Sequence, residues 1–119
     1  TNINTHILQM TKLYKNKAHL AWVHDLGCCL RNAEIADAIR PICNGVIQAH
    51  HLLKPWNGFR GIGMKASDKN VIPLCFAHHQ ALHNRGNEFD FFRLAMGDEN
   101  YGQKVAEVVW LTSPYFERD

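Results

Sequence analysis

The sequence predicts a single α+β domain over residues 1–119. Two short segments rich in β-branched residues, 46–52 and 71–74, predict strands, whereas the stretches before and after them have the apolar spacing of helices. A chain of 119 residues is long enough for one domain with a modest core and too short for two ordinary domains. The hydrophobic content of 46% and charged content of 20% are typical of a globular protein rather than a disordered one.

The N-terminal part of the chain is expected to form a helix followed by an irregular segment. Residues 11–25 carry apolar side chains at helical spacing among lysines, and Gly27 follows as a stop. Residues 28–45 have no long periodic pattern, and we expect one short helical turn within them at 33–39. The strand at 46–52 comes next, because its polarity alternates and its first residues favour extended backbone.

A long loop is expected to join the two strands, and helices follow the second one. Residues 54–69 contain one proline and three glycines and are predicted to form this loop. Pro73 in the second strand suits an edge or a strand end, because proline cannot donate a ladder hydrogen bond. Helices are expected at 76–84, 89–96 and 101–111. The aromatic residues expected to pack these flanking helices on the strands are Trp22, Trp110, Phe89, Phe91 and Phe92.

The formal net charge of +2 conceals an uneven distribution. Residues 88–119 carry seven acidic and three basic groups, which leaves ten basic and four acidic groups in residues 1–87. A basic body with an acidic tail is compatible with a polyanionic partner, although many unrelated domains share it. No apolar run approaches the roughly 18 residues that span a bilayer, and residues 1–11 lack the features of a secretory signal. We therefore expect no membrane association and a cytoplasmic location.

Histidine is the most informative residue type in this chain. Five of the eight histidines occur in the pair His50-His51 and in the segment 78–83. Imidazole binds transition metals, and such clustering is typical of a metal site. On a helix, His78 is rotated by about 100° from His79 and does not easily share its ion. The spacing therefore predicts two separate metal sites.

The first predicted site is a closed structural zinc site, which takes four ligands, usually Cys and His. Cys75 and His78 lie three residues apart where a helix is expected to begin, and they supply two ligands. Cys43 is expected to supply the third, and one of the adjacent Cys28 and Cys29 the fourth; we favour Cys28. Disulfides are not expected, because the secretory signal is missing and histidines are interleaved with the cysteines.

The second predicted site has an open coordination position. His79 and His83 lie four residues apart on one helical face, and His50 on the preceding strand completes the set. Adjacent residues of a strand point to opposite faces, so His51 stays free to act as a base. An ion held by three imidazoles can bind a phosphate oxygen and neutralise charge on a departing oxygen. These parts can hydrolyse a phosphodiester. His6, His19 and His24 are given no role.

Basic side chains surround the glycine-rich loop between the strands. Trp56 and Phe59 are interleaved with these basic residues, so the loop could grip a phosphate backbone and stack on unpaired bases. A solvated loop held to the core by its aromatics is an equally good interpretation. The candidate DNA contacts are Lys54, Arg60, Lys65 and Lys69.

Together these residues resemble the HNH, or ββα-metal, endonuclease superfamily. The matching residues are Gln48-Ala49-His50-His51-Leu52, Asp68-Lys69-Asn70-Val71-Ile72-Pro73-Leu74-Cys75-Phe76-Ala77-His78-His79 and His83. The resemblance covers about residues 20–93, and this wider segment is similar to small phage and prophage HNH proteins associated with recombination. It implies a zinc-stapled ββα-metal nuclease core at 28–87, between an N-terminal helical segment at 1–27 and a C-terminal one at 88–119.

The resemblance also implies roles for individual residues. HNH nucleases cut or nick DNA with one catalytic divalent ion, here expected to be Mg²⁺, Mn²⁺ or Zn²⁺. His51 matches the general base, and Asn70 matches the asparagine that braces the loop and helps to orient that base. The residues that match ligands of the catalytic ion are His50, His79 and His83. Those that match the structural zinc are Cys43, Cys75, His78 and one of Cys28 or Cys29. DNA is the expected partner, together with recombination proteins, in the cytoplasm of a bacterium or phage-infected host.

The sequence departs from the family pattern at the zinc site, and two other functional classes stay open. The usual close cysteine pair before the first strand is stretched to Cys28-x14-Cys43, and His78 replaces a cysteine. One alternative is a non-catalytic, zinc-stabilised nucleic-acid-binding module, which needs neither a third histidine nor a spare His51. Another is an enzyme with Cys28 or Cys29 as its nucleophile and a histidine nearby.

Overall fold

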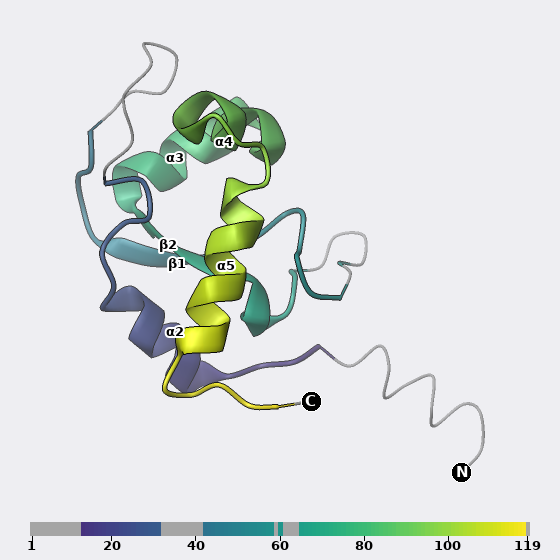
Figure 1. Cartoon of the computed structure of the whole chain (residues 1–119). Helices are drawn as coiled ribbons and strands as arrows, with labels where there is room; N and C mark the ends of the chain where they lie inside the picture. Colours follow the sequence, from purple (N-terminus) through teal and green to yellow (C-terminus); the bar gives the residue numbers. More distant parts are fainter. Residues whose placement is uncertain (1–12, 32–41, 59, 61–64, 119) are drawn as a thin grey trace.

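Two antiparallel strands form the sheet of this small α+β domain (Figure 1). The computed structural model describes residues 13–31, 42–58, 60 and 65–118. Strand β1 (Ile47–His51) pairs with β2 (Val71–Cys75), with Ile47 opposite Cys75 and His51 opposite Val71. Both strands lie where the sequence predicts them. Strand β1 is one residue shorter at each end than the expected strand at 46–52, and β2 is one residue longer than the expected strand at 71–74.

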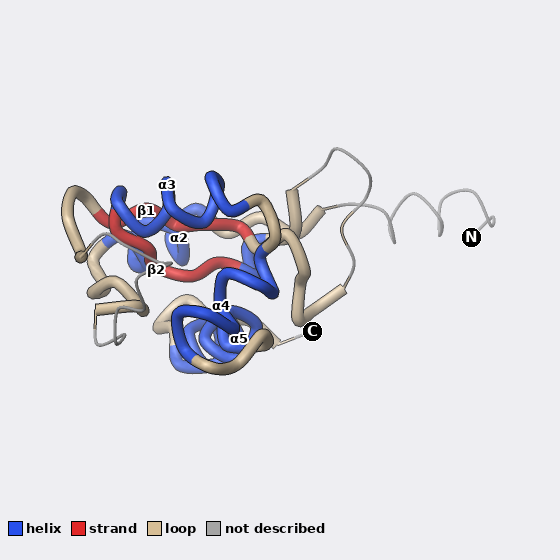
Figure 2. The backbone as a smooth tube through the Cα atoms, turned by 90° about the horizontal axis from the view of Figure 1, so that it is seen from above, coloured by secondary structure: helices blue, strands red, loops and turns tan. Residues whose placement is uncertain are grey.

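Helices surround the strand pair. Their bounds in the described part of the chain are Lys17–His24 for α2, Phe76–Arg85 for α3, Glu88–Met96 for α4 and Tyr101–Thr112 for α5. Helix α3 contacts both strands, α5 lies beside β2, and Figure 2 shows α3 and α5 on opposite sides of the strands. Among these helices none is both long and apolar enough to cross a bilayer.

The N-terminal helix is shorter than predicted. We expected helix over 11–25, but α2 begins at Lys17 because the side chain of Asn16 caps it by accepting a hydrogen bond from the backbone N–H of His19 at 3.0 Å. The short turn expected at 33–39 lies outside the described residues. The loop expected at 54–69 ends in a 3₁₀ turn, η2 (Asp68–Asn70). The three later helices agree with the predicted ranges to within one residue at each end.

Pro73 lies in the middle of β2, opposite Ala49, on an edge as expected but not at a strand end. Its carbonyl accepts a hydrogen bond from the backbone N–H of Cys29 at 2.9 Å. Within an antiparallel strand the N–H and C=O of one residue point to the same side. The position where Pro73 lacks an N–H therefore faces away from β1, so no hydrogen bond between the two strands is lost.

The main core lies between the strands and helices α3 to α5. Phe91 and Phe92 from α4 are 1% exposed and pack edge to face, with ring centroids 5.3 Å apart. Gly102 of α5 lies directly over the Phe92 ring, where a Cβ atom would come within 2.6 Å of it. Trp110 is also buried, whereas Trp22 and Phe89 are half-buried. The expected aromatic core is thus confirmed for Phe91, Phe92 and Trp110, with its centre on α4.

A second buried cluster contains His19, whose side chain is 0% exposed. Its Nδ1 lies 2.9 Å from Ser113 Oγ, while Nε2 has no hydrogen-bond partner among the described residues. The ring packs edge-on against Trp110, with centroids 4.9 Å apart. Burial lowers the pKa of His19 below its usual value of 6.5, which the charge of Asp68 opposes more weakly. His19 is therefore a neutral core residue near neutral pH.

Acid is expected to destabilise the domain through His19. The unfolded chain takes up a proton there near pH 6.5, whereas the folded state does so only at lower pH. The stability that the neutral ring contributes is complete above about pH 6.5 and is lost as the pH falls toward the folded pKa, by about 1.4 kcal/mol for each pH unit between the two pKa values. Urea unfolding at pH 7.5 and pH 5.5 should show a larger loss for the native protein than for His19→Gln. Equal losses would contradict this.

Candidate metal centres

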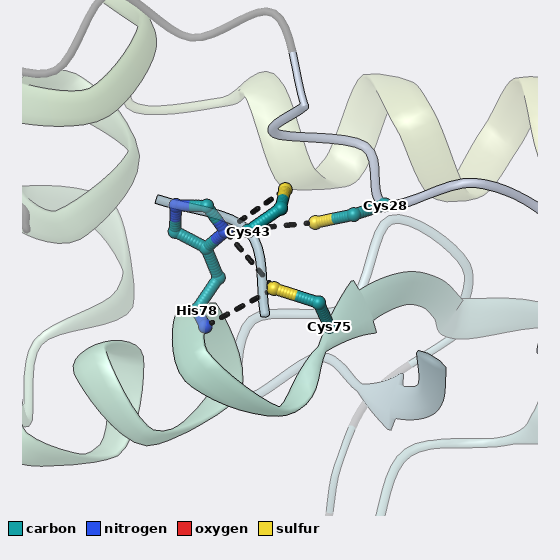
Figure 3. Close-up of side chains that lie close together, drawn as sticks. All are labelled: Cys28, Cys43, Cys75 and His78. Atoms are coloured by element: carbon teal, nitrogen blue, oxygen red, sulfur yellow. Dashed lines mark hydrogen bonds between the residues drawn. The ribbon is translucent and has the colours of Figure 1, made fainter. Parts of the chain in front are cut away.

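Three cysteines and one histidine converge on a common point (Figure 3). Cys28 comes from the loop after α2, Cys43 from the segment before β1, Cys75 from the end of β2, and His78 from the first turn of α3. The Nδ1 atom of His78 lies 3.7 Å from Cys28 Sγ, 3.5 Å from Cys43 Sγ and 3.2 Å from Cys75 Sγ. Tetrahedral zinc, bound at about 2.3 Å to sulfur and 2.0 Å to nitrogen, holds such atoms about 3.5 Å apart. The four residues can therefore hold a metal ion such as zinc.

The three thiol groups also lie close enough to repel one another when ionised, and a bound cation would relieve that repulsion. Burial raises the pKa of Cys28, and burial followed by the neighbouring Cys28 raises that of Cys43 to about 12. Burial also acts to raise the pKa of Cys75, but hydrogen bonds from the backbone N–H groups of His78 and Asn44 help to bring it below its usual value. Three thiolates so close together repel one another, and a bound divalent ion removes that repulsion.

The geometry separates Cys28 from its neighbour Cys29. Cys28 Sγ joins the cluster, whereas Cys29 is not part of it and packs against the main core. Burial raises the pKa of the Cys29 thiol well above its usual range. A nucleophilic cysteine requires a lowered pKa, because only the thiolate attacks. Both members of the pair have raised pKa values, so the structure does not favour a cysteine nucleophile at this position.

The second cluster is formed by His50, His79 and His83. His50 Nδ1 lies 3.1 Å from His79 Nε2, and His83 Nε2 lies 3.0 Å from the same atom. All three nitrogens lie within 4.8 Å of one another, close enough to share one ion. Burial, followed by the charges of the two neighbouring rings, lowers the pKa of His79 to about 4. His79 is therefore neutral at neutral pH, which is the state that binds a metal.

Two hydrogen-bond partners orient these rings. Gln48 Oε1 contacts His79 Nδ1, and Glu88 Oε1 lies 2.9 Å from His50 Nε2. Such partners fix the ring nitrogen that faces the ion. Neither partner was predicted from the sequence. Gln48 could have been found, because it lies two residues before His50 on the same face of β1. No local pattern identifies Glu88, which reaches the site from α4.

His51 points away from the three-histidine cluster, as the alternation of a strand requires. Its Nε2 lies 2.7 Å from Asp68 Oδ1 in η2, and the other oxygen of Asp68 accepts the backbone N–H of Asn16 at 2.7 Å. The His51 side chain is 17% exposed, so part of the ring is accessible to solvent. No role of its own was assigned to Asp68 from the sequence, and this pair was not predicted.

The Asn70 side chain braces the loop but makes no hydrogen bond to His51. It is 0% exposed, and its Oδ1 accepts the backbone N–H groups of Trp56 at 2.9 Å and Asn57 at 3.0 Å. Its Nδ2 donates to the carbonyl of Asn57 and to Ser67 Oγ, each at 3.0 Å. The partner that holds His51 is Asp68, two residues earlier.

The basic residues of the loop divide into two groups. Lys54, Arg60 and Lys65 are exposed. Lys69 is only 8% exposed, and its ammonium group lies 4.9 Å from the centre of the Tyr14 ring, packed inside the domain. A buried ammonium is poorly placed to reach a phosphate, so Lys69 is better described as a structural residue. Phe59 lies outside the described residues.

The fold and its side-chain clusters define the class: a small α+β domain with a Cys₃His cluster and a three-histidine cluster, each able to hold a metal ion. The chain belongs to the family described as "Protein of unknown function (DUF968)", whose model matches residues 8–109. No curated protein and no solved structure matches the chain.

Proposed function

We propose that this protein is a metal-dependent endonuclease of the ββα-metal (HNH) type that hydrolyses DNA phosphodiester bonds. The observation that carries the proposal is the convergence of His50, His79 and His83 beside the hydrogen-bonded pair of His51 and Asp68. The order of elements, β1 followed by β2 and α3, agrees with the proposed core.

In the proposed mechanism, His51 is the general base. A carboxylate only accepts hydrogen bonds, so Asp68 holds the proton of neutral His51 on Nε2 and leaves Nδ1 to take a proton from the attacking water. Asp68 also stabilises the imidazolium that forms. A divalent ion bound by the three histidines supplies Lewis acidity to the scissile phosphate and its leaving oxygen.

The Cys₃His cluster supports this centre structurally. Cys75 caps α3, because its sulfur accepts the backbone N–H of His78 at 3.4 Å. His79 is the next residue along the same helix. A zinc ion held by Cys75 and His78 would fix the first turn of α3 and, with it, the position of His79.

The second candidate function is a zinc-stabilised nucleic-acid-binding module without catalysis. The exposed Lys54, Arg60 and Lys65 favour nucleic-acid contact under either proposal. The two functions differ at the three-histidine cluster, since a binding module needs no ion there.

A plasmid nicking assay tests the proposal. Zinc-loaded protein is incubated with supercoiled plasmid and Mg²⁺, Mn²⁺ or added Zn²⁺, and the conversion to open-circular DNA is measured. Nicking that requires the added ion and disappears in His79→Ala supports the nuclease. DNA binding without nicking under every condition would favour the binding module.

The buried and exposed lysines are expected to respond differently to substitution. Lys54→Ala should weaken binding to a DNA duplex and lower the slope of log K against log salt by about 1, because one phosphate contact is lost. Lys69→Ala should instead lower the melting temperature, because it removes packing on Tyr14. Fluorescence anisotropy at several salt concentrations measures the first effect, and calorimetry the second. A change in salt slope for Lys69→Ala alone would reverse these assignments.

A further inference from the structure

Glu88 is a buried carboxylate whose two oxygens have separate partners. It is the first residue of α4 and is 4% exposed. Oε1 lies 2.9 Å from Nε2 of His50, while Oε2 accepts the backbone N–H groups of Leu53 and Lys54, each at 2.9 Å. Burying a carboxylate is unfavourable unless such partners satisfy it. All three partners lie in or just after β1, more than thirty residues earlier in the chain.

The contact with His50 determines which of its nitrogens can bind an ion. Glu88 can only accept, so the proton of a neutral His50 lies on Nε2. The lone pair is then on Nδ1, the atom 3.1 Å from His79 Nε2. Glu88 therefore fixes both the tautomer and the direction of this ring.

The contact with Leu53 and Lys54 belongs to a wider network that holds the loop after β1. The carbonyl of Leu53 accepts from Arg60 Nε at 3.1 Å, and that of Lys54 accepts from Gln103 Nε2 at 3.0 Å. Asn70 holds the next residues of the loop, as described above. Leu53 and Lys54 lie outside the strands, yet side chains from several elements bind their backbone while the Lys54 side chain stays exposed.

We propose that Glu88 is a positioning residue that couples the three-histidine site to the DNA-facing loop at Leu53 and Lys54. One carboxylate orients the His50 ring toward the ion and holds the loop that faces the DNA backbone. A shift of His50 therefore displaces the loop through Glu88, and a shift of the loop displaces His50. Metal binding and the placement of Lys54 are thus linked through Glu88. This inference rests on the second metal site of the proposed function.

Zinc titration of the full chain tests the coupling. The first equivalent fills the Cys₃His cluster, and the affinity for the second equivalent is measured by chelator competition. Glu88→Gln should weaken this second affinity by about 10- to 100-fold. Glutamine cannot make both contacts, because its side chain has only one acceptor oxygen. If this oxygen accepts from the backbone of Leu53 and Lys54, the NH₂ group faces Nε2 of His50, where an acceptor is required. Asp90→Asn is the matched control, because Asp90 lies on the same helix and pairs with Arg85 and Arg93 at the surface. Its second affinity should be unchanged.

A second measurement on the native protein does not depend on the folding of a variant. The amide signals of Lys54 and Val46, each four residues from His50, are followed by NMR as the second equivalent binds. Coupling through Glu88 predicts a larger shift for Lys54, and equal shifts would overturn it. Equal second affinities of the native protein and Glu88→Gln would overturn the inference alone. The absence of any second zinc in the native protein would overturn the proposed metal site as well.

Discussion

His51→Ala is expected to lower the rate of plasmid nicking by about 10²- to 10⁴-fold, the contribution typical of a positioned general base. Its affinity for the second zinc equivalent should stay within about twofold of the native value, because His51 faces away from the ligand cluster. Nicking rates under single-turnover conditions, measured beside the zinc titration, separate the two effects. A loss of rate with retained metal is the result expected of a base at this position.

The matched control for this variant is His24→Ala. His24 is exposed, and its Nδ1 lies 2.8 Å from the carbonyl of Ile47 in the same strand, but it belongs to neither metal cluster. It should nick DNA at the native rate. Asp68→Asn is an independent check, since it keeps the shape of the carboxylate, removes its charge and should also slow nicking. Undiminished nicking by His51→Ala would remove the proposed mechanism.

Cys28→Ala is expected to prevent stable folding, while Cys29→Ala is tolerated. Structural zinc contributes apparent binding free energies of about 10 kcal/mol or more, comparable to the whole stability of a small domain, about 5–15 kcal/mol. Removing a ligand forfeits much of that contribution, whereas Cys29 contributes only packing, worth about 1 kcal/mol. Zinc content and calorimetric melting of the two variants measure the difference. A zinc-free but folded Cys28→Ala protein would contradict the structural role of the ion, and a zinc-free Cys29→Ala protein would reverse the assignment.

The secondary structure was predictable wherever the local signal is strong. The strand pair and helices α3 to α5 follow from alternation, helical spacing and the glycine stop at Gly86, which caps α3 with a φ of 79°. The start of α2 was wrong because apolar spacing alone extends back to Thr11. The competing signal was Asn16, because asparagine is more favourable at the N-cap position than inside a helix.

The clustering of the candidate ligand residues was predictable because metals constrain spacing, whereas their supporting partners were not. The three- and four-residue steps from Cys75 and His79 place ligands on one side of a helix whatever the remainder of the fold does. Asp68 and Glu88 reach their histidines across the tertiary structure, over 17 and 38 residues of chain. A carboxylate at a helix start is common, and only the packing of α4 on α3 shows that this one faces His50. The burial of Lys69 was missed for the same reason, since burial cannot be read from a lysine in a polar segment.

The adjacency of His78 and His79 on α3 has an evolutionary consequence. Neighbouring positions of one helix serve different clusters, so inserting or deleting a residue between Cys75 and His78 would turn every later residue of α3 by about 100° relative to the strand. Because His78, His79 and His83 would all turn together, such a change would misalign both clusters. The spacing within this short stretch is therefore expected to be inherited as a unit.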